Sequence, residues 1–183
     1  MSLLSLIEKC KKNDRKAQFE LYDREHKALM KTAFRYHPNE EDAAEVVNLA
    51  FFKILTNLEK FDPEYSFGGW CKKVLMNTII DEFRKNKKFD NQISAEDSAM
   101  EVFIDNNSVE LALEVEEVSV ILNQIPDNER LVFNLYEMEG YSHKEIAQQL
   151  GVSERSSKRY LSQAKLNLKE IVSKITEPDR VAI

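Results

Sequence analysis

The chain has 183 residues, enough for one domain or two small ones, with 43% apolar and 32% charged residues, as in a soluble globular protein. No apolar run approaches the roughly 20 residues of a membrane span, so we expect a cytoplasmic protein with no membrane insertion. The three histidines and two cysteines lack metal-ligand spacing, and no phosphate-binding glycine loop occurs. We therefore expect no metal, no cofactor and no catalytic residues, which argues against an enzyme.

The formal net charge of −6 is unevenly distributed along the chain. Residues 1–90 hold 17 Lys and Arg against 15 Asp and Glu, and residues 121–183 hold nine of each sign. Residues 91–120 hold eight acids and no Lys or Arg. Both ends can therefore meet a polyanion, and the negative excess belongs to the middle segment.

The first ninety residues predict four helices. Residues 3–12 predict a short helix, and Asp14 can cap a second one that runs toward Tyr36. "HPNEED" predicts a turn and the acidic first turn of a third helix. Apolar residues recur there with helical period, so one face belongs to the core: Ala43, Val46, Val47, Ala50, Phe51, Ile54, Leu55 and Leu58.

The opposite face of that third helix carries an unusual pair of side chains. It consists of Glu41, Glu45, Asn48, Leu49, Phe52 and Thr56. Leu49 and Phe52 are large apolar groups on an otherwise polar face, which indicates a surface for a partner. The alternative is that the N-terminal helix covers them, and the residues alone leave both interpretations open.

A fourth helix follows the turn "KFDPEY", with Ser66 as its cap, and runs through residues 67–88. It combines aromatic groups, an amide and cations: Phe67, Trp70, Lys72, Lys73, Asn77, Arg84, Lys85, Lys87 and Lys88. Cations hold phosphates, aromatic faces stack on unpaired bases, and an amide pairs with a base edge. Core packing explains Trp70 equally well, whereas Asn77 is polar beside apolar neighbours and favours a function.

Residues 89–107 lack periodicity and predict a linker. Helical patterns return over about 108–123, 126–139, 142–150 and 153–174. In the third of these, Ser142 and Glu145 form a capping box, and Gly151 follows where the chain must turn. Ser153 then caps the last helix.

These last two helices predict a helix-turn-helix. The residues placed to fill their crossing are Ile146, Ala147, Leu150, Val152 and Leu161. Arg155, Lys158, Arg159, Lys165 and Lys169 stand against Glu154 alone, which gives the second helix a charge of +4 up to Lys169. A helical hairpin with a solvated basic face is the alternative to DNA binding.

The two helical ends together resemble an RNA polymerase sigma factor of the extracytoplasmic-function (ECF) group of the sigma-70 family, which is bacterial. "FELY", "EDAAEVVNLAFFKI" and "FDPEYSFGGWCKKVLMNTIIDEFRK" are similar to its first conserved block, polymerase-docking helix and promoter-melting helix. "IPDNERLVFNLYEMEGYSHKEIAQQLGVSERSSKRYLSQAKLNLKE" is similar to its upstream-promoter reader. The chain departs from the family at Glu45, Asn48 and Leu49, where Asp and Gln-Glu are usual. It departs again at Ser157 and Tyr160, where an apolar residue and Arg are usual.

The resemblance implies an all-α fold of two small helical domains joined by an acidic flexible linker, the second containing the helix-turn-helix. We expect a polymerase-docking and minus-ten domain at 1–90, a linker at 91–107 with an acidic extension to 120, and a minus-thirty-five domain at 108–176. The linker would then thread the basic cleft of the polymerase. The implied partners are core RNA polymerase, promoter DNA and an anti-sigma factor, and the implied function is directing the polymerase to promoters and melting the minus-ten element.

The implied site residues fall into three sets. The polymerase-binding set is Glu45, Asn48, Leu49 and Phe52. The minus-ten set is Tyr65, Ser66, Trp70, Lys73, Asn77, Arg84, Lys85, Lys87 and Lys88. The minus-thirty-five set is Ser153, Arg155, Ser156, Lys158, Arg159 and Lys165. The alternative function is a stand-alone helix-turn-helix regulator that binds an operator without polymerase.

Overall fold

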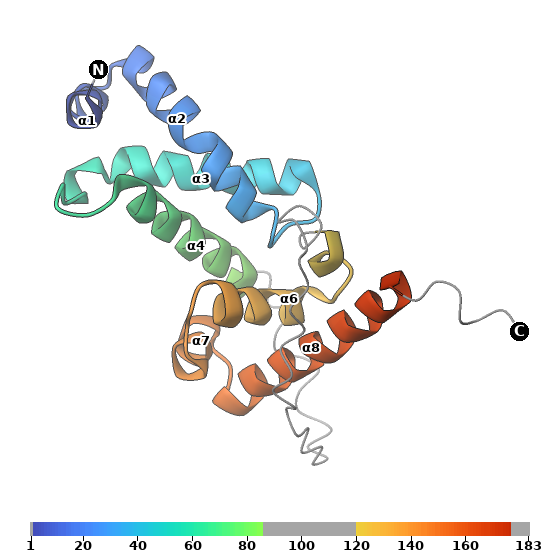
Figure 1. Ribbon diagram of the computed structural model, residues 1–183. Coiled ribbons are helices and arrows are strands. Elements are labelled where there is room, and N and C mark those ends of the chain that lie inside the picture. Colours follow the sequence, from blue (N-terminus) through green and yellow to red (C-terminus); the bar gives the residue numbers. More distant parts are fainter. Residues whose placement is uncertain (1, 86–119, 177–183) are drawn as a thin grey trace, which may run out of the picture. The chain divides into compact units, whose positions relative to one another are not determined.

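The computed structural model describes residues 2–85 and 120–176 (Figure 1). The chain divides into two compact units, Met1–Glu82 and Phe83–Ile183. Both described ranges consist of helices and the turns between them, without a strand, so the all-α prediction is confirmed for them. None of their helices has the length and hydropathy of a membrane span. The predicted linker, Lys87, Lys88 and most of the helix expected at 108–123 lie outside the described residues.

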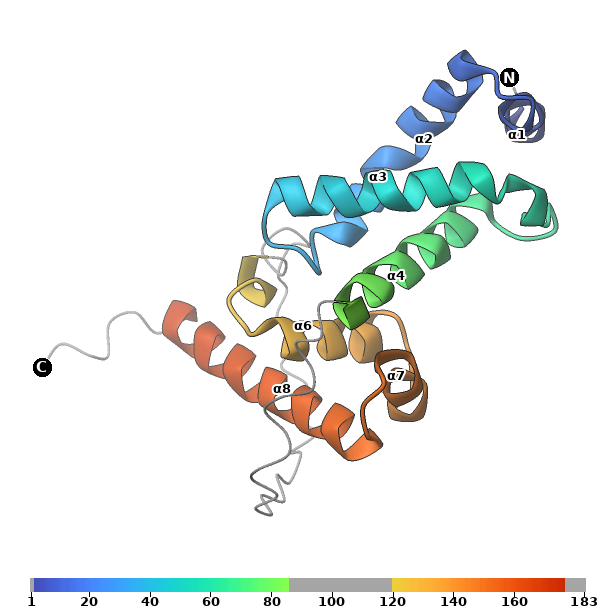
Figure 2. The same cartoon turned by 180° about the vertical axis from the view of Figure 1, so that it is seen from behind.

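The first unit contains α1 (Leu3–Lys11), α2 (Arg15–Ala33), α3 (Glu40–Thr56), the single turn η1 (Leu58–Lys60) and most of α4 (Phe67–Lys85). In Figures 1 and 2, α3 lies beside both α2 and α4, while α1 packs against α2 and η1. The buried centre is aliphatic, with Leu21, Val47, Ile54, Leu75 and Ile79. Cys10 and Cys71 are buried free thiols, and burial raises the pKa of both, so neither is poised to react.

Two helices of this unit begin at the side-chain caps that the sequence predicts. The carboxylate of Asp14 accepts hydrogen bonds from the backbone N–H groups of Lys16 and Ala17, at 2.9 and 3.1 Å. The hydroxyl of Ser66 accepts the N–H of Gly69 at 3.3 Å and so caps α4. Such bonds satisfy N–H groups that have no partner inside the helix.

The second unit contains α6 (Asp127–Phe133), η2 (Asn134–Met138), α7 (His143–Leu150) and α8 (Glu154–Thr176). Both α6 and α7 pack against α8. The single helix expected at 126–139 is wrong in detail, because it divides at Asn134 into α6 and the π-helical turn η2. The N–H of Glu139 bonds five residues back, to the carbonyl of Asn134, at 3.0 Å. Leu135, which lies in this wider turn, is fully buried in the unit's core.

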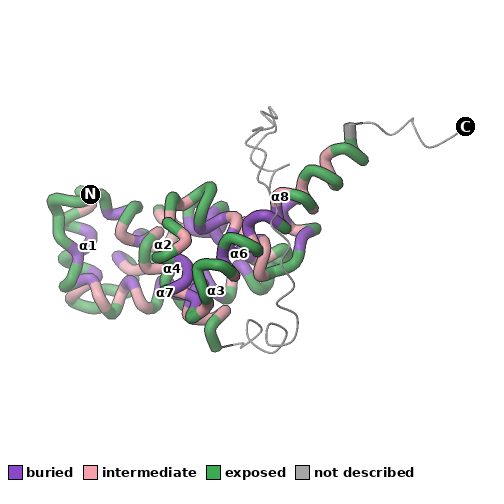
Figure 3. The backbone as a smooth tube through the Cα atoms, turned by 90° about the horizontal axis from the view of Figure 1, so that it is seen from below, coloured by how far each residue is buried: buried purple, intermediate pink, exposed green. Residues whose placement is uncertain are grey.

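Figure 3 shows buried and exposed residues alternating along the helices of each unit. This is the pattern of amphipathic helices around a core. A small apolar cluster formed by Leu122, Ile125 and Ala164, with Phe133, Leu168 and Ile171 packed against it, holds the C-terminal half of α8. The remaining exposed faces carry the candidate functional residues.

Candidate functional site

The turn between α7 and α8 has the geometry that the sequence predicts. The hydroxyl of Ser142 accepts the N–H of Glu145 at 3.3 Å, and the Glu145 carboxylate accepts the N–H of Ser142 at 2.8 Å. Gly151 has a φ of 71°, the left-handed region that favours glycine. Its N–H and that of Val152 both bond to the carbonyl of Ala147. The capping box and the glycine turn are therefore confirmed.

Apolar contacts hold α7 against α8. Ile146, Ala147 and Leu150 of α7 and Leu161 of α8 are buried, as predicted, and Val152 is half-buried. The small side chain of Ala147 suits the close approach of two helices. Together with the turn, these contacts make a helix-turn-helix whose second helix is α8.

The N-terminal half of α8 presents the cations. Arg155, Lys158 and Arg159 are exposed, within five residues of one another. The predicted contacts Ser153 and Ser156 serve the cap of α8, because the Ser153 hydroxyl accepts the N–H of Ser156 at 3.0 Å. Their two hydroxyl oxygens lie 2.8 Å apart.

Lys165 stands apart from these cations. Its ammonium pairs with the carboxylate of Glu137 at 2.8 Å. A half-exposed pair of this kind leaves less of the charge for a phosphate than an exposed lysine would. Binding DNA through Lys165 would require this pair to be rearranged.

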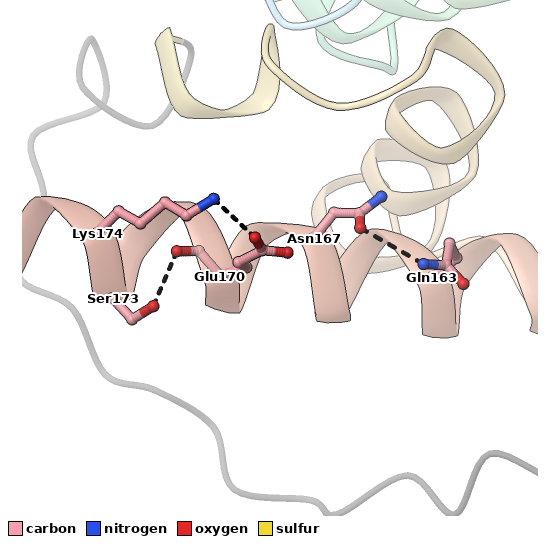
Figure 4. Close-up of polar contacts among 5 residues, drawn as sticks. All are labelled: Gln163, Asn167, Glu170, Ser173 and Lys174. Carbon is pink, nitrogen blue, oxygen red and sulfur yellow. Dashed lines mark hydrogen bonds and ion pairs between the residues drawn. The ribbon is translucent and has the colours of Figure 1, made fainter. Parts of the chain in front are cut away.

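Polar contacts in the C-terminal half of α8 are made within the protein. The Asn167 amide donates to the carboxylate of Glu129 on α6 at 2.7 Å, and the Gln163 amide donates to Asn167 at 3.4 Å. Figure 4 shows Gln163 and Asn167 together with a second group one turn on, where Lys174 pairs with Glu170 at 2.7 Å. Burial raises the pKa of Glu129 although the Asn167 bond opposes the shift. This half of α8 is therefore a scaffold and the N-terminal half is the exposed basic surface.

The second candidate surface lies on α4 and the loop before it. Lys73 and Asn77 are exposed and, four residues apart, share one face of the helix, and Arg84 and Lys85 are exposed toward its C-terminal end. In the preceding loop Ser66 is exposed, and the side chain of Tyr65 is 71% exposed. The structure thus presents an amide flanked by cations, as predicted, with an exposed aromatic group in the adjacent loop.

Trp70 is half-buried beside this surface. The centroid of its ring lies 5.6 Å from that of Phe61 and 5.8 Å from that of Phe67. Aromatic rings at these distances contribute to packing. The packing interpretation of Trp70 is therefore supported, and base stacking stays a prediction.

The third candidate surface is the outward face of α3. Leu49 is 46% exposed and Phe52 65% exposed, and Glu45 beside them is also exposed. Asn48 is exposed too, and its side-chain oxygen accepts the hydroxyl of Tyr22 at 2.9 Å. The alternative in which the N-terminal helix covers Leu49 and Phe52 is wrong, since both remain exposed.

The sequence interpretation missed Phe19, which is 73% exposed on α2. It lies one turn before Tyr22, whose ring meets that of Phe51 on α3 edge to face at 4.9 Å. The helical period could have found it, because Ala17 and Leu21 define the buried face of α2 and Phe19 lies off that face. Within 2–85 and 120–176, no group of His, Cys, Asp and Glu side chains is arranged to hold a metal ion.

Comparisons with known proteins match both units. The family description "Sigma-70 region 2" matches residues 21–89, and "Sigma-70, region 4" matches residues 116–168. RNA polymerase sigma factor SigZ of Bacillus subtilis is 25% identical over 158 residues, which cover 84% of this chain and 85% of SigZ. The ECF RNA polymerase sigma-E factor of Escherichia coli is 26% identical over 152 residues, 78% of this chain and 79% of that factor.

A solved structure of the sigma factor RpoE in complex with the anti-sigma factor NepR, from Bartonella quintana, is 18% identical with a TM-score of 0.49. It covers 84% of this chain and 95% of that one. The two family matches span most of the described residues and fall on the surfaces described above. The chain belongs to the sigma-70 family of RNA polymerase sigma factors, in its ECF group, and is a non-enzymatic transcription initiation factor that directs polymerase to promoters.

Proposed function

We propose that this chain docks on core RNA polymerase through α3, recognises and melts the minus-ten element through α4, and recognises the minus-thirty-five element through α8. The corresponding domains are residues 1–90 and 108–176, joined by the acidic linker at 91–107 with its extension to 120. The observation that carries the proposal is the exposure of Leu49 and Phe52 on α3 in a chain that also has a helix-turn-helix.

Docking relies on apolar burial. Leu49 and Phe52 are 46% and 65% exposed, so covering the exposed part of each in an interface is worth about 1–2 kcal/mol, less than the roughly 1.5–3 kcal/mol for a fully exposed side chain. Glu45 adds a negative charge beside them, and the side-chain oxygen of Asn48 already accepts a hydrogen bond from the hydroxyl of Tyr22. A partner that covers the two apolar groups thus gains most of its affinity from a small area, as interface hot spots do.

Melting relies on the mixture of groups on α4. Lys73, Arg84 and Lys85 can hold phosphates whether the duplex is closed or open. Asn77 carries no charge for a phosphate, and its amide is useful once a base edge leaves the stack. Tyr65 and Ser66, exposed in the preceding loop, lie where the family reads the extruded base, although Ser66 also caps α4.

Promoter binding is then shared between the partners. Two units of modest DNA affinity gain effective concentration when both are carried by one large DNA-binding polymerase. This explains how a chain of net charge −6 makes use of a basic recognition helix. An anti-sigma factor, common in this family, would act by covering one of the same exposed surfaces.

Run-off transcription with core RNA polymerase, with and without the protein, tests the proposal. We expect specific transcripts only when the protein is present. Changing Leu49 and Phe52 together to Lys should abolish both transcription and co-purification with the polymerase, while far-UV circular dichroism stays helical. The matched control changes Leu4 and Ile175, which are exposed to a similar degree on α1 and α8, to Lys and should retain both activities.

Two outcomes contradict the proposal. Tight operator binding by the protein alone, with no transcript from the reconstituted polymerase, would establish a stand-alone regulator. Unchanged co-purification of the Leu49 and Phe52 variant would place the docking surface elsewhere.

A further inference from the structure

A polar contact joins the first residue of α7 to the first turns of α8. The Nδ1 atom of His143 lies 3.0 Å from the hydroxyl oxygen of Ser157, fourteen residues along the chain. Ser157 is fully buried, in a position where an apolar side chain would make a simpler contact. A buried hydroxyl needs a hydrogen-bonding partner, and His143 supplies it.

The imidazole also makes a contact through its ring face. Its ring stacks on that of Tyr136 in η2, with centroids 4.5 Å apart and planes inclined by 23°. The series Tyr136, His143 and Ser157 therefore connects η2, α7 and α8. Together with α6, which also packs against α8, these elements set the direction in which the N-terminal half of α8 points.

We propose that His143 and Ser157 are a positioning pair, which holds the first turns of α8 in the orientation that presents Arg155, Lys158 and Arg159 to promoter DNA. The proposal rests on the proposed minus-thirty-five recognition. Ser157 lies inside the basic sequence on the helix face turned away from solvent, so it acts on DNA through the direction of the helix. Neither residue of the pair needs to touch a base.

The size of the effect follows from the strength of one hydrogen bond. One hydrogen bond contributes about 0.5–1.5 kcal/mol net. A free energy of this size changes the ratio of two orientations of the first turns of α8 about two- to tenfold. Apparent affinity falls in proportion to the fraction of molecules that holds the competent orientation. Loss of the pair should therefore weaken promoter binding by up to about tenfold, and by less where most molecules keep the competent orientation.

The charge state of His143 gives an independent signature. Burial lowers its pKa, Lys158 and Lys165 lower it further, and Glu154 opposes them. Of the charged groups on the neighbouring elements, Lys165 is itself paired with Glu137 of η2. Lys144 and Glu145 directly follow His143 on α7. The packed orientation therefore favours neutral His143. A group whose pKa is depressed by packing binds more protons when the packing loosens, so the stabilisation is present at neutral pH and is lost as the pH falls below about 6.5.

The first test uses the free full-length chain and requires no promoter. Hydrogen exchange at about pH 7.5 and about pH 5.5 follows the backbone amides of Ser156, Ser157 and Lys158. Ser157→Ala and His143→Ala should each lower their protection about two- to tenfold at the higher pH, and the double variant should be no worse than either single one. His143→Asn places an amide near the position of Nδ1, so it should recover part of the protection without the pH dependence of the parent.

Ser162→Ala is the matched control, because Ser162 is a buried serine of the same helix with no described hydrogen bond to another element. It should leave protection within about twofold of the parent. Additive losses in the double variant, or unchanged protection in Ser157→Ala, would overturn the pair. A pH dependence that persists in His143→Asn would overturn the role of the imidazole.

The second test uses the holoenzyme on a promoter recovered by run-off transcription from fragments of the host genome. Ser157→Ala should lower promoter affinity, by no more than the factor by which it lowers protection. If the parent yields no promoter, the proposed function fails, and the pair can then affect only the packing of α8. If the parent yields a promoter and Ser157→Ala binds it equally well, the proposed function stands and the positioning role is overturned.

Discussion

Asn77 occupies the middle of α4 as an exposed amide, with Lys73 one turn before it and the cations Arg84 and Lys85 about two turns after it. The neighbouring Met76, Thr78, Ile79 and Ile80 are all buried. The side chain therefore contributes nothing to the core, and it has no charge for a phosphate. A base edge is the ligand that best suits it.

We predict that Asn77→Ala separates DNA binding from strand opening. The cations that we expect to hold the DNA backbone are unchanged, so the closed complex should form nearly as well as with the parent. Opening at the minus-ten element, measured by permanganate reactivity, should fall, because extruding a base costs a few kcal/mol that the amide helps to offset. Pre-melted templates should recover much of the lost transcription.

Lys73→Ala, one turn away, is the control for this prediction. It removes a cation that we expect to hold a phosphate, so it should weaken binding to closed and pre-melted templates alike and reduce the salt dependence. If Asn77→Ala opens promoters as well as the parent, Asn77 is structural, and Tyr65 and Ser66 become the better candidates.

Arg159 offers a second prediction at the scale of one residue. It is exposed on α8, and its guanidinium carbon lies 5.4 Å from the centroid of the Tyr160 ring. Arg159→Ala should cost about 1–3 kcal/mol of promoter affinity and change the preferred sequence if the guanidinium contacts a base. Arg159→Lys keeps the charge but not the paired donors, so it should recover affinity without recovering preference. A uniform loss across promoters would identify a phosphate contact.

At the scale of elements, the turn between α7 and α8 depends on one backbone conformation. A β-carbon on Gly151 would meet nothing within 4 Å, so the positive φ is the sole obstacle to a larger residue there. Gly151→Ala should therefore destabilise the second unit by about 1–2 kcal/mol through backbone strain alone. Thermal unfolding of the whole chain, followed by far-UV circular dichroism and fitted with one transition for each unit, measures this loss.

Gly69→Ala provides the contrast. Gly69 lies in the first turn of α4 at negative φ, and an added β-carbon would make an ordinary contact of 3.6 Å with Ser66. The substitution should leave the first unit unchanged or stabilise it by up to about 1 kcal/mol. Equal effects at the two glycines would contradict the explanation from backbone strain.

The elements that local chemistry specifies are the ones that the sequence predicts. Asp14, Ser142, Gly151 and Ser153 each act within a few residues of themselves, and all four have the predicted geometry. The π-helical turn at Asn134 could not be predicted, because it depends on how Leu135 fits a core made by distant residues. The contact between His143 and Ser157 is hidden for the same reason, since the folded unit joins residues with no local relation.

The candidate surfaces likewise contain some features that the local sequence predicts and others that depend on contacts between different elements. Helical period places Leu49, Phe52 and Asn77 off the core face, and the structure shows that all three are exposed, which the sequence left open for Leu49 and Phe52. The pairing of Lys165 with Glu137 and the engagement of Asn48 by Tyr22 join different elements, so period alone gives no sign of them. Whether these residues contact polymerase or DNA stays a prediction.

At the scale of the whole molecule, charge is segregated along the chain. The ends carry nearly balanced charge with local basic faces on α4 and α8, and residues 91–120 carry eight acids without a base. Such a segment is electrostatically similar to RNA and is suited to a basic channel in a partner. We expect that in the free chain the same acids weaken the attraction of DNA to the basic faces of α4 and α8.

We therefore predict that replacing the eight acids of residues 91–120 by their amides increases the affinity of the free chain for duplex DNA of any sequence. The change takes the formal net charge from −6 to +2. The gain should be several-fold at about 50 mM salt and should shrink markedly by about 200 mM, because screening limits the reach of exposed charges to roughly 10 Å. Fluorescence anisotropy with a labelled duplex measures this gain in affinity.

The matched control exchanges Glu for Asp and Asp for Glu at the same positions, which keeps the charge, so this variant should bind as the parent does. Equal affinity of the amide variant and the parent at low salt would mean that the acids do not act on the DNA-binding surfaces. The weak binding of the free chain would then come from its two small surfaces alone, with polymerase supplying the remaining affinity by holding both on one promoter.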